Sequence, residues 1–213
     1  SMYNIPYYKE DDQVIINQFV AKHPFAMISG TGVNQKPVAT QVPLLLEDSN
    51  GRKVLRGHVM KNTDHHKGFV ANEDVLVVFT GKDCYVSGSW YSQPHTASTW
   101  NYMSVYVNGI IRFVDDTGLR DIMRKTTLHF EGSNPQSPTV YDNLDPGFIK
   151  RASAMIAGFE IEITKMEAVF KLSQDRDQES YRNIIEKLKS QEDDGPSIAA
   201  EMEMREKALY RKK

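Results

Sequence analysis

The stretch from Gly57 to Lys67 combines cations with groups that could bind an anion. It contains Asn62-Thr63-Asp64-His65-His66-Lys67, where an expected strand ends and a short helix begins. The first N–H groups of a helix have no partner within it, so they attract anions. Cations in the first turn oppose the helix dipole at a cost of about 0.3 to 1 kcal/mol. A bound phosphate would make the same cations stabilising, because its negative charge attracts both them and the helix start. The local sequence alone still favours a solvated polar turn.

Two further segments could meet a ligand. Arg56, on the strand before this turn, is a candidate second cation. Pro43 cannot donate to a strand ladder, so it marks an edge, a bulge or the end of pairing. Main-chain atoms around Thr40, Gln41 and Val42 would then suit the polar edge of a flat ligand. An ordinary edge strand is the simpler interpretation of this segment.

Aromatic residues are concentrated in one window, which holds both tryptophans of the chain. Such side chains have an apolar face and a polar edge, so they suit a flat ligand or a protein interface. Packing in a barrel core is the competing explanation for some of them. The residues are Tyr85, Trp90, Tyr91, Trp100, Tyr102 and Tyr106.

Composition and motifs argue against several classes of protein. The formal net charge is -2, so we expect no direct DNA binding without a local basic patch, and no helix-turn-helix is evident. The six histidines and single cysteine show no zinc spacing, and we expect no metal. Nucleophile-elbow, Walker and dinucleotide motifs are absent from the sequence. No dedicated catalytic motif is found, which leaves open whether the protein is an enzyme.

The expected setting is a reducing cytoplasm. Cys84 cannot form an internal disulfide, and no apolar stretch reaches the roughly 18 residues of a membrane span. The N-terminus does not resemble a signal peptide. Ser1 before Met2 has the look of an expression scar.

Periodicity predicts a mainly β protein with peripheral helices, of the α+β class. Strands in succession favour an antiparallel barrel over a parallel α/β sheet. We expect strands over 25–29, 37–46, 54–60, 75–79, 84–87, 99–114 and 159–169, and helices over 11–22, 65–71, 119–130, 148–156 and 175–188.

The last part of the chain differs in character. Residues 191–196 interrupt the preceding helix, and 198–213 are rich in charge. This segment is a frayed helix, an arm against a partner subunit or a solvated tail, and the last is slightly favoured. We therefore expect one domain over 2–190, with helical additions, and a charged tail over 191–213.

Taken together, five segments resemble the PaiB-type family, described as FMN-binding negative transcriptional regulators. The likeness runs from about Met2 to Leu188 in the same order and spacing. Each motif alone is weak, and their combination is specific. The motifs are Ala39-Thr40-Gln41-Val42-Pro43-Leu44-Leu45-Leu46, Leu55-Arg56-Gly57-His58-Val59 to Asn62, Tyr85-Val86-Ser87 with Trp90-Tyr91, Thr99-Trp100-Asn101-Tyr102 and Phe170-Lys171-Leu172-Ser173-Gln174.

The resemblance implies a six-stranded antiparallel split β-barrel and a homodimer with two flavin mononucleotide (FMN) sites at the subunit interface. It places the strand Thr40, Gln41, Val42 and Pro43 against the ring, and Arg56, His58, Asn62, His66 and Lys67 around the phosphate. Trp100 and Asn101 would approach from the partner subunit. Lys171, Ser173 and Gln174 would lie near the cleft and touch a second ligand. Many relatives have Asn-Pro and an aromatic where this chain has Asn62-Thr63-Asp64, so the resemblance does not fix the individual phosphate ligands.

Three functions follow as hypotheses. The first is a non-catalytic FMN-binding regulator that senses flavin or redox state and affects transcription indirectly. The second is a flavin-dependent oxidoreductase, resembling flavin reductases or pyridoxamine phosphate oxidases, because FMN carries the redox chemistry itself. The third and weakest is a barrel that binds haem or another flat ligand through its aromatic window. The sequence names no substrate, operator or redox partner.

Overall fold

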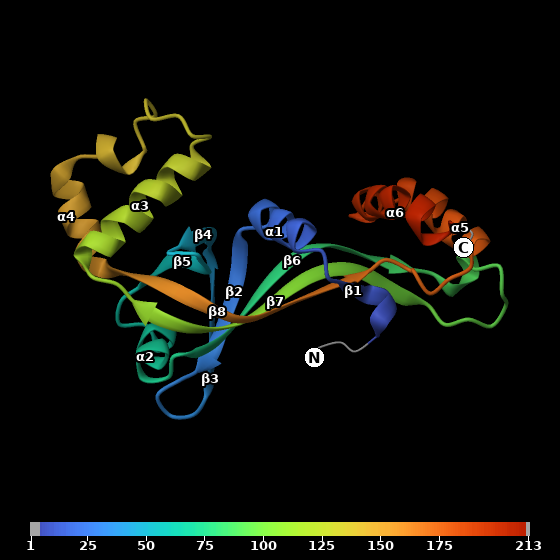
Figure 1. Ribbon diagram of the computed structural model, residues 1–213, viewed down its shortest axis with the longest axis horizontal. Helices are drawn as coiled ribbons and strands as arrows, with labels where there is room; N and C mark the ends of the chain where they lie inside the picture. The colour runs from blue at the N-terminus through green and yellow to red at the C-terminus, as the bar shows by residue number, and fades with distance from the viewer. Residues whose placement is uncertain (1–4, 212–213) are drawn as a thin grey trace. The chain divides into compact units, whose positions relative to one another are not determined.

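The computed structural model describes residues 5–211 of the 213-residue chain (Figure 1). Eight strands form one sheet in the order β3-β2-β6-β7-β8-β5-β4, with β1 paired to β8. The pairings of β2 with β3 and β6, and those of β8 with β1 and β5, are antiparallel. The strands are β1 Lys9–Glu10, β2 Phe25–Thr31, β3 Pro37–Pro43, β4 Leu45–Ser49, β5 Arg52–Met60, β6 Asp74–Val86, β7 Thr99–Phe113 and β8 Ile156–Lys171.

Six α-helices and three short 3₁₀ helices precede, connect or follow these strands within the described residues. The α-helices are α1 Gln13–Lys22, α2 Asp64–Ala71, α3 Asp116–Phe130, α4 Pro146–Met155, α5 Gln178–Lys189 and α6 Gly195–Leu209. The 3₁₀ helices are η1 Pro6–Tyr8, η2 Gly88–Trp90 and η3 Tyr141–Asn143.

The chain forms two compact units. The first unit contains the N-terminal segment through Phe19, Thr80–Val105 and the segment from Glu167 onward. The second unit contains Val20–Phe79 and Tyr106–Met166. The long strands β6, β7 and β8 each contribute residues to both units. All three belong to the one sheet described above.

Two glycines bring backbone segments of the second unit close together. A Cβ added at Gly57 on β5 would lie 2.8 Å from Leu44 Cδ2 and 3.1 Å from the Pro43 carbonyl oxygen, so this strand approaches the end of β3. A Cβ at Gly68 would lie 3.0 Å from Gly32 Cα, so α2 packs directly on the β2–β3 connection. These contacts fix the start of α2 relative to β3 and β5.

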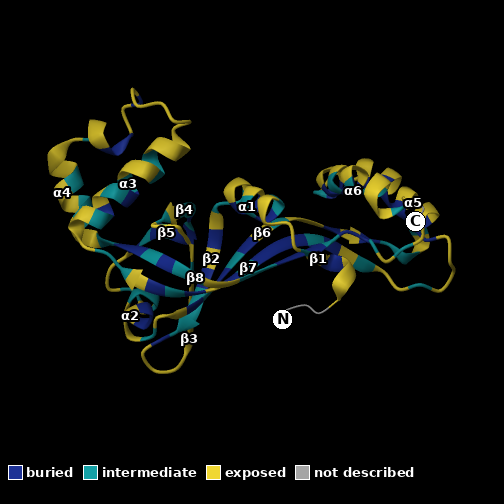
Figure 2. Cartoon of the chain, in the orientation of Figure 1, coloured by how far each residue is buried: buried dark blue, intermediate teal, exposed yellow. Residues whose placement is uncertain are grey.

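The first unit carries a helical hairpin formed by α5 and α6, and these two helices lie side by side (Figure 1). Its inner faces are buried and its outer faces exposed (Figure 2). Tyr181 is fully buried, and its hydroxyl donates to the Met202 carbonyl oxygen at 2.9 Å. Ile198, Ala199 and Met202 of α6 are also buried. Of the three interpretations for this segment, the solvated tail was therefore wrong, because three apolar positions of α6 face α5.

Several boundaries differ from the sequence expectation. The sheet has eight strands rather than six, and the strand expected over 37–46 is divided at Leu44 into β3 and β4. The strands expected over 75–79 and 84–87 are the single strand β6. The strand runs unbroken through its polar middle residues, where Lys82 and Asp83 are both exposed and the alternation of burial shifts by one residue. The domain limits expected at 2–190 and 191–213 stay a prediction; the first unit includes residues on both sides of 190.

Candidate functional site

The start of α2 in the second unit has the geometry of a capped helix terminus. Thr63 is the N-cap, and its Oγ1 accepts from the His66 N–H at 3.2 Å. The Asn62 N–H donates to His66 Nδ1 at 3.2 Å, with Asn62 at a positive φ of 66°. Because Nδ1 accepts, a neutral His66 carries its proton on Nε2 and can donate it to a ligand.

Positive charge gathers around this terminus. Burial lowers the pKa of His66, and the cations Lys61 and Lys67 lower it further. Both lysines are exposed, as is Asp64, the one acidic residue in the first turn. A helix start with unused N–H groups and two adjacent lysines fits a phosphate group. The donor set around Asn62, His66 and Lys67 therefore suits the phosphate of FMN.

Arg56 has a different environment from the one expected. Its guanidinium donates to Glu160 Oε2 at 2.9 and 3.0 Å and to Asp121 Oδ2 at 2.9 Å, and it lies 3.3 Å from Glu47 Oε2. These three carboxylates occupy the fork of the guanidinium. Arg56 ties β5 to β4, α3 and β8, and we do not include it among the phosphate ligands.

The strand expected to meet a flat ring has a free edge. β3 pairs with β2 on one side, with Gln41 opposite Met27 and Thr40 opposite Ile28, and it is the terminal strand in the order of pairing. Its other edge runs near β5, at the close approach of Gly57 to Pro43. Main-chain donors and acceptors of an unpaired edge suit a ring that has both kinds of group.

The side chains of β3 and β5 expected to meet the ligand differ in burial. Val42 is buried, Thr40 and Pro43 are half-buried, and Gln41 is exposed. His58 on β5 is half-buried, and that burial lowers its pKa. The second unit thus holds Thr40 to Pro43, His58, Asn62, His66 and Lys67, all expected from the sequence.

The remaining expected residues belong to the first unit. Trp100 is 54% exposed and lies edge-on to Tyr85, with ring centroids 6.0 Å apart. Asn101 is fully buried, and its Nδ2 donates to Ser173 Oγ at 2.9 Å. Adjacent residues of a strand face opposite sides. Trp100 is therefore available to a ligand or partner, whereas the Asn101 side chain is used inside its own unit.

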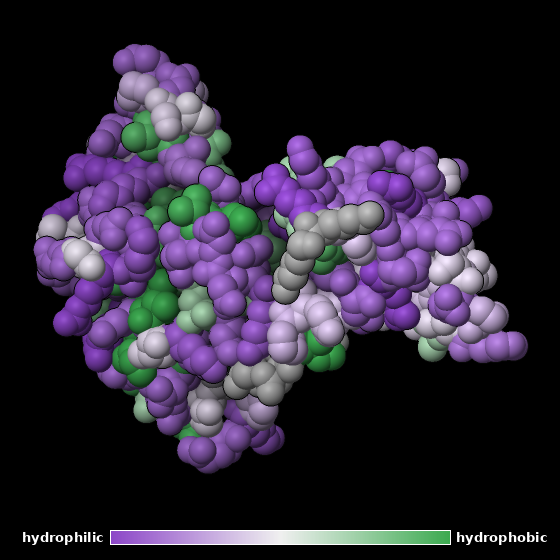
Figure 3. All heavy atoms as spheres, turned by 45° about the vertical axis from the view of Figure 1, so that its right-hand side comes forward, coloured by the Kyte–Doolittle hydropathy of each residue, from purple (hydrophilic) through white to green (hydrophobic). Residues whose placement is uncertain are grey.

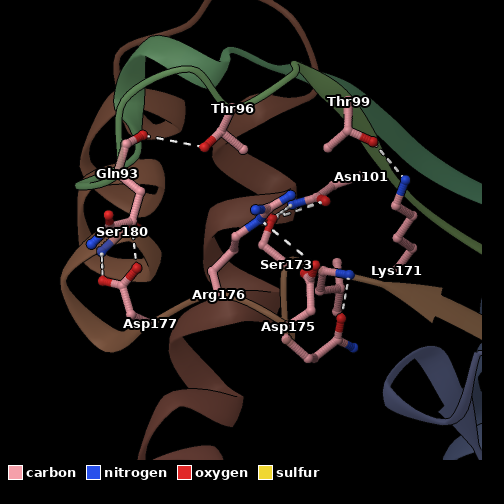
Figure 4. Close-up of polar contacts among 12 residues, drawn as sticks. Gln93, Thr96, Thr99, Asn101, Lys171, Ser173, Asp175, Arg176, Asp177 and Ser180 are labelled. Carbon is pink, nitrogen blue, oxygen red and sulfur yellow. Dashed lines mark hydrogen bonds and ion pairs between the residues drawn. The ribbon is translucent and has the colours of Figure 1, made fainter.

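The cluster expected to touch a second ligand is drawn in Figure 4. Lys171 Nζ donates to Thr99 Oγ1 at 2.6 Å. Gln174 folds back on its own segment, with Oε1 accepting from the Leu172 N–H at 2.7 Å and Nε2 donating to the Phe170 carbonyl at 2.5 Å. The Ser173 hydroxyl donates a hydrogen bond to Asn101 Oδ1 at 3.1 Å. Lys171 keeps unused donors because an ammonium has three, and Gln174 Nε2 keeps a second N–H, whereas the Ser173 hydroxyl has its single donor in use.

Arg176 was not among the site residues expected from the sequence. The helix expected to begin at 175 instead begins at Gln178, because Asp177 is the N-cap and accepts from the Ser180 N–H at 2.9 Å. Arg176 thus precedes the helix, and its Cζ lies 4.3 Å from the centroid of the Tyr91 ring. The Asp at position 177, three residues before Ser180, was the signal that would have moved the helix start.

Two negative observations apply to the described part of the chain. Among residues 5–211, no group of three or more His, Cys, Asp or Glu side chains is placed to hold a metal ion. No helix in this range is long and apolar enough to span a membrane. Figure 3 shows hydrophobic residues at the surface among hydrophilic ones. The large exposed hydrophobic side chains include Phe25, Phe130 and Phe148.

Comparison with known proteins identifies the family. A family model described as "Putative FMN-binding domain" matches residues 2–165. Protease synthase and sporulation protein PAI 2 of Bacillus subtilis (strain 168) is 31% identical over 201 residues, covering 94% of this chain and 96% of the relative. The fold is a split β-barrel, and the match to the FMN-binding family model shows that the cofactor is a flavin. The chain belongs to the FMN-binding domain family, of the PaiB type that the sequence resembles.

Solved structures agree on the fold. A conserved hypothetical protein from Mycobacterium tuberculosis is similar with a TM-score of 0.57 at 10% identity, covering 79% of this chain and 90% of that chain. The flavocytochrome Anf3 from Azotobacter vinelandii also has a TM-score of 0.57, at 15% identity, covering 79% of this chain and 71% of that chain. At these identities the likeness establishes the architecture alone.

Proposed function

We propose that this protein is a homodimeric FMN-binding regulator that senses flavin or redox state and lowers transcription indirectly, in the cytoplasm. The observation that carries the FMN assignment is the start of α2, where a capped helix terminus, Lys61 and Lys67 surround His66. Family membership supports the same cofactor. The regulatory part rests on the family and on the absence of an overall basic charge that direct DNA binding would favour.

The residues of the second unit would divide the work of binding. Lys67 would supply a charge to the phosphate, and the His66 Nε2–H and unused N–H groups of the helix start would donate to it. The free edge of β3 around Thr40 and Gln41 would orient the ring through main-chain groups. When bound, FMN supplies the capacity to accept and release electrons. The exposed Trp100 would cover the flavin of the partner subunit.

Two flavins separate phosphate recognition from ring recognition. Lys67→Ala should weaken FMN binding by about 1.5 to 3 kcal/mol, through loss of a charge-assisted contact, and should leave riboflavin binding unchanged because riboflavin has no phosphate. The control is Lys53→Ala, since Lys53 pairs with Asp48 on the surface. Equal FMN affinity in Lys67→Ala and the parent protein, measured by calorimetry, would move the phosphate site elsewhere.

Mixed dimers test the contribution of the partner subunit. If Trp100 of one subunit covers the flavin bound by the other, Lys67→Ala and Trp100→Ala homodimers should each bind FMN weakly. Mixing them should restore one high-affinity site per heterodimer. A monomer by light scattering, or no restoration on mixing, would contradict the dimer assignment.

The alternative is a flavin-dependent oxidoreductase, and a redox assay distinguishes it. We expect reduced nicotinamide to bleach the bound flavin anaerobically no faster than it bleaches free flavin. Reduction well above that rate would favour the oxidoreductase. For the indirect mode of regulation, we expect only weak, salt-sensitive association with promoter DNA at physiological salt, and tight sequence-specific binding would contradict it.

A further inference from the structure

The hydroxyl of Tyr91 lacks a partner inside the first unit. Tyr91 is 9% exposed, and within residues 5–211 its hydroxyl is the one buried side-chain nitrogen or oxygen with no hydrogen bond. Burial raises the pKa of Tyr91 and the guanidinium of Arg176 partly offsets that rise, so the group is a neutral O–H donor at physiological pH. An unpaired buried hydroxyl costs stability. Such a group in a native structure calls for a ligand or another explanation.

Arg176 is held against the same ring. Its Cζ lies 4.3 Å from the Tyr91 ring centroid. Its main-chain N–H donates to the Ser173 carbonyl at 3.1 Å, and its main-chain carbonyl accepts from the Tyr210 hydroxyl at 2.6 Å. Asp175 Oδ2 lies 3.7 Å from Arg176 Nε, which is too long for a hydrogen bond. Asp175 therefore leaves guanidinium donors available.

Lys171 adds a second cation to this cluster. It donates to Thr99 and retains further N–H donors. Burial lowers the pKa of Lys171, and Arg176 is near enough to lower it further while Asp175 raises it. Lys171, Asp175 and Arg176 together carry a net charge of +1 when all are ionised, and Figure 4 shows all three near the end of β8.

We propose that Tyr91, Lys171 and Arg176 form a binding site for the carboxylate of a small organic acid. A guanidinium presents paired donors to a carboxylate, the tyrosine hydroxyl supplies a further donor, and a single negative charge balances the cluster. A phosphate dianion would leave the cluster with an excess negative charge. The proposal uses residues of the first unit only, so it stands independently of the FMN site.

The test uses the full chain with FMN added and three monocarboxylates as probes: acetate, pyruvate and benzoate. Calorimetry at constant ionic strength, set with chloride, should detect binding of at least one probe. Arg176→Gln should weaken that binding at least tenfold and Tyr91→Phe about fivefold. Absence of binding by all three probes, or tighter binding of inorganic phosphate, overturns the proposal.

Thermal unfolding gives a readout that a merely structural role would not produce. Without a carboxylate, Tyr91→Phe should unfold at the same temperature as the parent protein or higher, because the unpaired hydroxyl is removed. With the carboxylate present, it should gain less stability than the parent. The matched control is Tyr181→Phe, whose hydroxyl already bonds Met202; it should lower the unfolding temperature and leave carboxylate affinity intact. A Tyr91→Phe protein that is less stable without carboxylate would overturn the proposal.

Discussion

Asn101 and Ser173 exchange two hydrogen bonds inside the first unit. Asn101 Nδ2 donates to Ser173 Oγ at 2.9 Å, and that hydroxyl donates to Asn101 Oδ1 at 3.1 Å. Both side chains are buried, whereas the adjacent Trp100 is 54% exposed. Strand alternation thus gives two neighbours of one sequence motif opposite roles.

Alanine substitutions at Asn101 and Trp100 should have different effects, the first on the stability of the protein and the second on FMN binding. Asn101→Ala should lower the free energy of unfolding by about 1 to 3 kcal/mol, because it leaves the Ser173 hydroxyl unpaired. Trp100→Ala should change stability by less than about 1 kcal/mol and weaken FMN binding. Urea denaturation and FMN titration of both proteins check this pair. The opposite pattern, with binding lost only in Asn101→Ala, would return Asn101 to the ligand site.

FMN binding should raise the pKa of His66. In the free protein, burial and two lysines hold that pKa below its usual value, so the ring is neutral at pH 7. A nearby phosphate favours the protonated ring, and linkage then requires FMN affinity to increase as pH falls through this pKa. Proton NMR of the His66 ring measures the shift. Riboflavin, which has no phosphate, is the control, and the pKa of His66 should stay lower with riboflavin than with FMN. The same pKa with both flavins would show that His66 does not contact the phosphate.

Asp121 should contribute to stability only above acidic pH. Its hydrogen bond with Lys125 lowers its pKa, and Arg56 lowers it as well. A carboxylate whose pKa is lower in the folded state stabilises above its unfolded pKa, and that contribution is lost as pH falls through the folded pKa. The side chain is 46% exposed, so Asp121→Asn should cost at most about 1 kcal/mol at pH 7.

Denaturant unfolding at pH 7 and below pH 3 measures the effect of Asp121→Asn. The difference from the parent protein should vanish at the lower pH. Asp48→Asn is the control, because its partner Lys53 binds it at a more exposed position. A cost that persists below pH 3 would show that the asparagine disturbs packing rather than charge.

Gly57 should tolerate no side chain. A Cβ there would lie 2.8 Å from Leu44 Cδ2 and 3.1 Å from Phe159 Cζ, so Gly57→Ala should destabilise the protein by about 1 to 3 kcal/mol. It should also weaken FMN and riboflavin equally, since it displaces β3 from β5. Gly51→Ala is the control: it meets nothing within 4 Å and carries only the strain of its φ of +79°. Equal costs in the two variants would mean that the approach of β5 to Pro43 is loose.

Local signals identified most elements and the helix start that we assign to the phosphate. Helix caps were recognisable among Asn62, Thr63 and Asp64, and Pro43 was recognisable as an edge, a bulge or the end of pairing, since each acts through its own backbone chemistry. The break at Leu44 and the continuity of β6 could not be read in the same way. Both depend on which neighbouring strand each residue pairs with, and the pairing strand can be distant in sequence.

The sequence by itself determined the family, the mainly β class and the grouping of Asn62, His66 and Lys67, because motif order and helix capping are local properties. Only the tertiary structure decided the roles of the charged and polar side chains. Arg56 faces three carboxylates, Asn101 is buried against Ser173, and Arg176 lies on Tyr91. The partners come from segments up to 104 residues apart, and a cation's function depends on which charge the fold places beside it.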